Sequence, residues 1–419
     1  MLDVVVKNTE RFLLSVPKTK RKKYGQFFTN MSTAKFMASL FCFDRSKPCL
    51  EILDAGAGTG ILATAVIQKL IDDGYKGRIH VTCYETDDFV MPVLEENMRL
   101  STVLPNVTCS IKTDNYITSQ NFSDYTLFGG EDSHYDYIIG NPPYLKTSKD
   151  AIEALAMPEV CYGAPNLYFL FWAMGIHNLK EGQELVYIIP RSWTSGAYFK
   201  RFREYLFREC VLTDIHLFEK RDKVFDGESV LQETMIVKVK KTRVVPSAIN
   251  ITTSSTSDFK DISSFSAPYE TVVTKNHCVC VVTNSDDVNV LHTINHFSKT
   301  LPEINLKMQT GIIVDFRTRE VLRNELEEGA YPLLYAQHIR EGKIVWPLGK
   351  EGEVIKTERK SYLQENGNFL LVKRFTSKEE PRRLQCGIYL KKKFDKFKYI
   401  STHNKVNFIK CDSPCVTYG

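Results

Sequence analysis

The chain alternates short, β-rich apolar runs with helix-period segments from about residue 50 to residue 239 of its 419 residues. Parallel strands need helical crossovers, so this alternation is typical of an α/β, doubly wound sheet. The expected strands are residues 50–54, 79–85, 107–111, 135–140, 185–190 and 213–218, and the expected helices are residues 61–72, 90–100, 166–179 and 197–209. Residues 233–240 follow a strand with no helix between, which predicts a late antiparallel strand.

The alternation stops near residue 250, where Ser and Thr become frequent. We expect residues 1–250 to form one domain, residues 251–297 a connection, and residues 298–419 a second domain of mixed α+β structure. Charge supports this division, because residues 1–297 carry 32 Lys+Arg against 35 Asp+Glu, whereas residues 298–419 carry 23 against 15. The net charge of +5 therefore hides a basic C-terminal third, whose interleaved aromatic residues favour nucleic-acid binding.

Composition argues against several other classes of protein. The hydrophobic share of 43% and the charged share of 25% are those of a globular protein, not of a fibre or a long disordered chain. No apolar run approaches the roughly 20 residues of a membrane helix, and Asp3 stands where a leader would be basic. The eleven cysteines show no CxxC spacing, so we expect free thiols in a reducing, cytoplasmic setting and no metal site.

Residues 54–60, Asp-Ala-Gly-Ala-Gly-Thr-Gly, end the first expected strand and open a helix. Gly56, Gly58 and Gly60 would let the backbone approach a ligand closely. Asp54 would repel the pyrophosphate of a dinucleotide, whereas a cationic ligand would be attracted to it. S-adenosylmethionine carries a sulfonium and an ammonium group, so the motif favours this cofactor. A tight turn without a ligand is the alternative.

Acidic residues follow the next two expected strands. Glu85 ends the second strand, and its carboxylate offers two acceptors for the two hydroxyls of a ribose. Asp87 is the alternative for that role. Asp114 follows the third strand, where it could accept a hydrogen bond from an adenine amino group; a turn or cap aspartate is the alternative there.

The tetrapeptide Asn141-Pro142-Pro143-Tyr144 comes directly after the fourth expected strand. The two prolines fix the backbone and remove two N–H donors, which leaves the carbonyls of Asn141 and Pro142 exposed beside the Asn141 side-chain oxygen. Two such acceptors fit the two hydrogens of an exocyclic amine and make its lone pair available to attack a methyl sulfonium. Tyr144 offers a flat face on which a planar substrate could stack.

Together these residues resemble the cofactor and catalytic motifs of N6-adenine-specific DNA methyltransferases. Residues 24–29, Tyr-Gly-Gln-Phe-Phe-Thr, are similar to the N-terminal motif of the gamma-ordered group, in which the catalytic domain precedes the target-recognition domain. The resemblance implies that Thr29 helps to hold the methionine end of the cofactor. Residues 223–227 resemble the segment that supplies an aromatic ring to the flipped base. We carry that role to Phe225, with Phe218 as competitor and core packing as the alternative for both.

Two later segments, residues 310–317 and 371–375, resemble the recognition half of type II restriction-modification methylases of the Eco57I-like sort. The resemblance implies methyl transfer to adenine N6 of double-stranded DNA by base flipping, and a cognate restriction endonuclease acting on the same site. It also implies that the basic residues of the second domain bind DNA, and the candidates are Arg317, Lys373, Arg374, Arg382 and Arg383. The chain ends soon after residues 400–409, which leaves open that part of the recognition domain is missing.

Other interpretations of the same motifs stay open. An RNA adenine or a protein glutamine amide presents the same two hydrogens to the Asn-Pro-Pro-Tyr loop. A DNA-binding subunit with a lapsed site is a further alternative, although the intact set of Asp54, Glu85, Asp114 and Asn141 argues against it. A C5-cytosine enzyme is disfavoured because Pro48-Cys49 and Pro414-Cys415 lie away from the catalytic loop.

Overall fold

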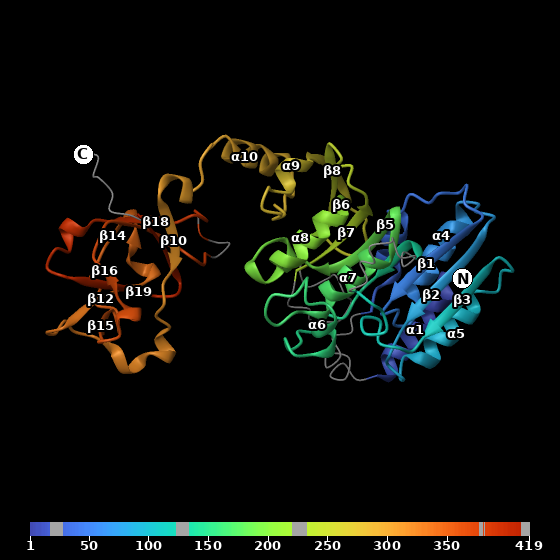
Figure 1. The fold of residues 1–419 in the computed structure, drawn as a ribbon, viewed down its shortest axis with the longest axis horizontal. Helices are drawn as coiled ribbons and strands as arrows, with labels where there is room; N and C mark the ends of the chain where they lie inside the picture. The colour runs from blue at the N-terminus through green and yellow to red at the C-terminus, as the bar shows by residue number, and fades with distance from the viewer. Residues whose placement is uncertain (17–27, 123–133, 220–232, 377–379, 381, 412–419) are drawn as a thin grey trace. The chain divides into compact units, whose positions relative to one another are not determined.

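The computed structural model describes residues 1–16, 28–122, 134–219, 233–376, 380 and 382–411. The chain divides into two compact units, Met1–Ile294 and Asn295–Gly419 (Figure 1). The residue 223–227 segment, including Phe225, and most of the residue 24–29 segment lie outside the described residues.

The first unit is built on a nine-stranded sheet with the strand order β3-β2-β1-β4-β5-β7-β6-β8-β9. Five strands are mutually parallel: β1 (Cys49–Ala55), β2 (Arg78–Tyr84), β3 (Val107–Lys112), β4 (Tyr135–Gly140) and β5 (Leu179–Pro190). The interior residues of β4 and of the second half of β5 are buried on both faces, so these strands are mostly apolar in the sequence, whereas the edge strand β3 is mostly half-buried. The doubly wound α/β prediction is confirmed.

The predicted late antiparallel strand is β7 (Thr234–Lys241), which lies between β5 and β6 (Cys210–Phe218) and runs antiparallel to both. Two further strands, β8 (Ala248–Ser254) and β9 (Ser263–Pro268), extend the sheet beyond β6. They occupy part of the segment that we expected to be a connection. Its hydroxyl-rich residues form a strand because they pair across the sheet: Thr252 bonds His216 at 2.8 Å and Thr253 bonds Ser263 at 2.8 Å.

Helices cover both faces of this sheet (Figure 1). One group packs together through α4: α1 (Leu2–Ser15), α3 (Met31–Ser39), α4 (Ile61–Asp72) and α5 (Met91–Ser101). The other group packs through α7: α6 (Ile152–Ala156), α7 (Leu167–Asn178) and α8 (Lys200–Glu209). The short α9 (Tyr269–Val272) and α10 (Ser285–Asn295) follow β9. Helix α1 was not predicted; its buried Leu2 and Val5 join the core of the first unit.

The second unit contains two small sheets with cores of their own. One has the order β10 (Leu306–Thr310), β20 (Val406–Cys411), β17 (Phe369–Lys373), β18 (Cys386–Tyr389), β14 (Gly342–Ile344), β13 (Ile339–Arg340). The other has the order β11 (Leu322–Arg323), β15 (Val354–Lys356), β12 (Ala330–Leu334), β19 (Tyr399–Thr402), β16 (Gln364–Glu365). The helices described after α10 are of the 3-10 type.

No helix among the described residues is long and apolar enough to cross a membrane.

Candidate active site

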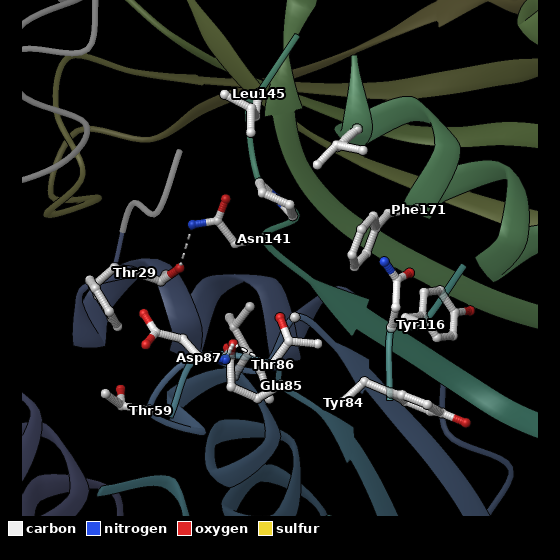
Figure 2. A pocket seen from close by; sticks show the side chains of 18 of the residues that line it. Thr29, Thr59, Tyr84, Glu85, Thr86, Asp87, Tyr116, Asn141, Leu145 and Phe171 are labelled. Atoms are coloured by element: carbon white, nitrogen blue, oxygen red, sulfur yellow. Dashed lines mark hydrogen bonds between the residues drawn. The ribbon is translucent and has the colours of Figure 1, made fainter. Parts of the chain in front are cut away.

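A cavity of about 410 Å³ lies at the carboxyl ends of β1, β2, β3 and β4 (Figure 2). Strands β1 and β4 are neighbours although β2 and β3 come between them in the chain, so the cavity sits where the strand order reverses, the usual ligand site of such sheets. Its volume is that of a small-molecule site. Besides the loops after the strands, its lining includes Phe28, Thr29, Glu153, Leu167 and Phe171.

The glycine-rich loop after β1 forms the floor of this cavity. The backbone N–H groups of Gly56 and Ala57 both donate to the Tyr84 carbonyl, each at 2.9 Å, which ties the loop to the end of β2. Gly58 has φ +55°, and a Cβ there would lie 3.4 Å from the Phe28 ring. Gly60 has φ +79° and forms the N-cap of α4 outside the cavity lining. The loop therefore needs glycine for its left-handed backbone and for the space above it.

Asp54 lies beneath the loop and does not line the cavity. Its side chain is fully buried, and Oδ2 accepts a hydrogen bond of 3.1 Å from the Ala63 N–H in the first turn of α4. Burial raises the pKa of Asp54 to about 7, and the nearby Glu85 adds to the rise. The sequence suggested that Asp54 contacts a ligand directly. In the structure its carboxylate instead holds the start of α4 against β1 and so supports the cavity indirectly.

Glu85 connects the glycine loop to the end of β2. Its Oε2 accepts from the Gly58 N–H at 2.9 Å, and its Oε1 accepts from the N–H groups of Thr86 and Asp87 at 2.8 and 2.9 Å. Burial raises the pKa of Glu85, and these three hydrogen bonds oppose the rise. Because a carboxylate can accept about four hydrogen bonds, Glu85 keeps capacity for a ligand on the cavity side. Asp87 lines the same cavity, so both candidates for the ribose remain in place.

Asp114 is exposed and lines the end of the cavity formed by the loop after β3. The next residue, Asn115, donates from Nδ2 to Glu153 Oε1 at 2.9 Å and so joins this loop to α6. The carboxylates in the lining are those of Glu85, Asp87, Asp88, Asp114 and Glu153, and the described lining contains no Lys, Arg or His. An acidic cavity of this kind favours a cationic ligand.

The Asn-Pro-Pro-Tyr loop follows β4 at the edge of the cavity. Asn141 and Pro143 contribute to the lining, whereas Pro142 is buried. The Asn141 amide donates from Nδ2 to Thr29 Oγ1 at 3.1 Å (Figure 2). The structure therefore brings together two predicted residues that are 112 positions apart in the chain.

Tyr144 lies deeper than the sequence suggested. Its side chain is 8% exposed, its hydroxyl donates to the Ile188 carbonyl at 3.0 Å, and its ring meets the edge of Tyr168 at 6.3 Å. It does not line the cavity. Phe218, the competitor for the second stacking position, packs against His216 at 4.7 Å, as the core-packing alternative expects.

Comparison with known proteins identifies the chain's relatives. A family model described as Eco57I restriction-modification methylase matches residues 63–225. The type II methyltransferase M.BsuBI of Bacillus subtilis is 32% identical over 394 residues, which cover 92% of this chain and 78% of that protein. The chain belongs to the type II restriction-modification methyltransferases. M.PstI of Providencia stuartii, another member, is 31% identical over 386 residues, which cover 90% of this chain and 75% of its own.

A solved structure also shares the fold of this methyltransferase. It is a nuclease-deletion mutant of the type ISP restriction-modification enzyme LlaGI in complex with a DNA substrate mimic. The TM-score is 0.50 at 11% identity, and the match covers 92% of this chain and 48% of the other. At this identity the likeness concerns the fold alone.

S-adenosylmethionine is the cofactor of this family's fold, and the residues of the cavity fit it. The positive charge of the sulfonium and ammonium groups complements the acidic lining. The apolar lining residues Phe28 and Phe171 flank the glycine loop, since a Cβ at Gly58 would lie 3.4 Å from one ring and a Cβ at Gly56 would lie 3.5 Å from the other. Phe28 falls within the residue 24–29 motif but was given no role there, and Phe171 was missed in the sequence analysis. Phe171 could not be found there, because α7 is apolar on all sides and gives no periodic signal.

A support for the glycine loop was also missed. Thr9 of α1 donates to Thr59 Oγ1 at 2.8 Å, and Asn97 of α5 donates to the Thr59 carbonyl at 2.8 Å. Helices α1 and α5 therefore hold the loop from below. Nothing in the local sequence distinguishes these residues from other polar residues on helices.

The basic residues expected to bind DNA all lie in the second unit. Arg317, Arg374, Arg382 and Arg383 are exposed, and Arg374 also donates to the Asn404 carbonyl at 3.3 Å. Lys373 is half-buried and forms an ion pair of 3.6 Å with Glu380. No group of three or more His, Cys, Asp or Glu residues that could hold a metal ion occurs in the described part of either unit.

Proposed function

We propose that this methyltransferase transfers a methyl group from S-adenosylmethionine to N6 of adenine in double-stranded DNA, as the modification component of a restriction-modification system. The observation that carries the proposal is the Asn141 amide at the edge of the acidic cavity. Its nitrogen donates a hydrogen bond to Thr29, and its oxygen points away from Thr29 (Figure 2). A carbonyl-type acceptor beside a methyl-donor site is the arrangement that an amine nucleophile needs.

The chemistry follows from two fixed acceptors. The adenine amino group donates one hydrogen to Asn141 Oδ1 and one to the Pro142 carbonyl. These bonds draw the nitrogen lone pair out of conjugation with the ring and direct it at the methyl carbon. With the cofactor bound, the amine so oriented would take its methyl group, and the extra proton on the nitrogen would pass to solvent. The cofactor supplies the electrophilic methyl group when bound.

The cofactor would be held by residues at the ends of the first three strands. Glu85 would accept hydrogen bonds from the ribose hydroxyls, and Asp114 would accept one from the adenine amino group of the cofactor. Thr29, which lines the cavity beside Asn141, lies where the methionine end would reach the catalytic loop. Gly56 and Gly58 would allow the close approach of that end to the backbone.

The target amine lies inside the DNA base stack, so the adenine must be flipped out before it can reach Asn141. Tyr144 is the predicted stacking residue, but its ring is buried and outside the cavity lining, so stacking on the flipped base would require the catalytic loop to rearrange. Phe225 would provide the second stacking surface. The basic second unit, with Arg317, Arg382 and Arg383 exposed, would contact the phosphate backbone.

The test is to incubate the purified protein with S-adenosylmethionine carrying a labelled methyl group and, in parallel, duplex DNA, RNA and a glutamine-containing protein substrate. The proposal expects label in DNA, and digestion to nucleosides should place it in N6-methyladenine. Label confined to RNA or protein would refute it. A cognate endonuclease should cut unmethylated DNA and fail to cut the methylated product. The cellular location expected from the proposal is the cytoplasm, where the DNA substrate would be reached.

A further inference from the structure

We propose that a groove between the two small sheets of the second unit receives the edge of an A·T base pair of the DNA substrate, and that the Gln309 amide reads the adenine. This inference rests on the proposed function, because it names the surface through which the enzyme would choose the sequence that it methylates. The groove has a volume of about 330 Å³ and lies wholly within the second unit.

The two walls of the groove come from different sheets. Strands β10 and β20 contribute Gln309, Thr310 and Phe408, and strands β16 and β19 contribute Gln364, Ser401 and Thr402. No described residue of the lining carries a charge, and most of them carry an amide or a hydroxyl group. Such a lining suits a flat, neutral ligand with hydrogen-bonding atoms along one edge. A base pair presents that edge in the major groove of DNA.

Gln309 faces this groove with an amide that the protein does not use. Its partner in the strand register is Phe408, and residues directly opposite each other lie on the same face of a sheet. The Gln309 side chain is half-buried, and none of the described residues forms a hydrogen bond with its amide. A glutamine amide can donate to N7 of adenine and accept from N6 at the same time, a pairing that matches this base.

Two lysines lie beside Gln309 on the same face of the sheet. Lys307 and Lys410 are directly opposite each other in the register of β10 and β20. Like charges in that position destabilise a sheet, and no described carboxylate forms an ion pair with either of them. Lys410 instead donates to Gln364 Oε1 at 3.1 Å. A phosphate of the DNA backbone at this place would relieve the repulsion.

The opposite wall also carries a positive charge. Arg359 Nη1 donates to the Tyr362 hydroxyl at 3.2 Å, and its guanidinium lies 5.6 Å from the centre of the same ring. Glu365 is exposed, and it follows Gln364 in β16, so its side chain points to the other face of that strand. An uncharged centre between cationic edges matches DNA, in which base edges lie between two rows of phosphates.

The test compares the sequence preference of the wild type with that of variants of the full chain. Each protein methylates a library of duplexes with randomised sequence, and the positions of N6-methyladenine are then sequenced. Gln309→Leu keeps a similar size but removes the donor and the acceptor. It should lose the preference for adenine at one position other than the methylated base. The ratio of kcat/KM values for adenine over the other bases there should fall by about 5- to 150-fold.

A second variant and two controls accompany this measurement. Gln309→Glu cannot donate to N7, so it should lose the preference at the same position. Gln385→Leu is the matched control, because Gln385 is half-buried in the same unit, outside the groove lining, and donates to the Arg382 carbonyl at 3.2 Å. It should keep the wild-type preference. Lys307→Gln should weaken binding to all sequences alike and reduce the slope of log Kd against log salt concentration by about 0.9.

The melting temperature of Gln309→Leu should stay close to that of the wild type, since no described residue loses a hydrogen bond. The inference is overturned if folded Gln309→Leu and Gln309→Glu keep the wild-type preference at every position, as they would if the groove served a protein partner. It is also overturned if the relaxed position is a G·C pair, or if Gln385→Leu relaxes the same position. A wild-type protein that methylates no DNA would instead refute the proposed function.

Discussion

Replacing Glu85 with glutamine should weaken both the fold of the first unit and the binding of S-adenosylmethionine. In the wild type the carboxylate accepts three backbone hydrogen bonds of 2.8–2.9 Å, from Gly58, Thr86 and Asp87. A glutamine has one acceptor oxygen instead of two. Its NH₂ group must therefore face at least one of these N–H donors, and that donor loses its partner.

The magnitude follows from opposing effects. A buried donor without an acceptor costs about 1–3 kcal/mol. Burial raises the pKa of Glu85, so removal of its charge returns part of this cost, and we expect a net loss of about 1–2 kcal/mol in the free energy of unfolding. For the cofactor, the loss of one charged acceptor toward a ribose hydroxyl is equivalent to about 1.5–3 kcal/mol, which raises Kd by roughly 10- to 150-fold.

Urea unfolding and calorimetric titration with S-adenosylmethionine measure the two effects. Asp87→Asn is the control, because this carboxylate lines the same cavity and is the other candidate for the ribose. We expect its Kd to stay within about threefold of the wild type. A Glu85→Gln protein that keeps both wild-type values would refute this reasoning. If Asp87→Asn alone loses affinity, the ribose contact belongs to Asp87.

Other perturbations test separate parts of the molecule. Burial raises the pKa of Asp54 to about 7, so the folded state keeps a proton that the unfolded chain loses above about pH 4. The free energy of unfolding should therefore fall as the pH rises from 4 to 7. The fall should be smaller in Asp54→Asn. Gly60→Ala should lower the free energy of unfolding by about 1–2 kcal/mol because of its φ of +79°, and by more because a Cβ there would lie 2.6 Å from a methionine side chain. Gly74→Ala is the control, because its φ is +76° and a Cβ there would meet open space. Urea unfolding of this control should show the backbone cost alone. Replacing Arg382 and Arg383 with glutamine should reduce the slope of log Kd for DNA against log salt concentration by about 0.9 for each phosphate that the variant no longer neutralises. The affinity for the cofactor should stay unchanged. An unchanged slope would show that these two residues do not contact the DNA phosphates.

The parallel strands β4 and β5 could be predicted because burial on both faces makes them largely apolar, and β2 and β3 could be predicted from their alternation with helical segments. The antiparallel β7 could also be predicted, since it follows a strand without a helical segment. Strands β8 and β9 could not, because they are rich in hydroxyl residues such as Thr253 and Ser263, which pair across the strands but in the sequence resemble an exposed loop. The strands of the second unit are only two to six residues long and give no reliable period.

The position of the site could be predicted from the sequence, because loops that follow neighbouring parallel strands meet at one edge of the sheet. The direction of each side chain could not. Asp54 turns under the loop toward Ala63, and Tyr144 turns toward the Ile188 carbonyl, because these contacts depend on how α4 and β5 pack. The hydrogen bond between Asn141 and Thr29 joins two segments whose distance in the chain hides their proximity.

The central claim is that Asn141 directs an adenine amine at the cofactor's methyl group. The most direct measurement is mass spectrometry of nucleosides from DNA methylated by the wild type and by Asn141→Ala, with the cofactor Kd of each protein measured alongside. The account predicts N6-methyladenine with the wild type, and loss of methylation with a cofactor Kd within about threefold in the variant. Wild-type levels of N6-methyladenine from Asn141→Ala, or a methylated base other than adenine from the wild type, would contradict it.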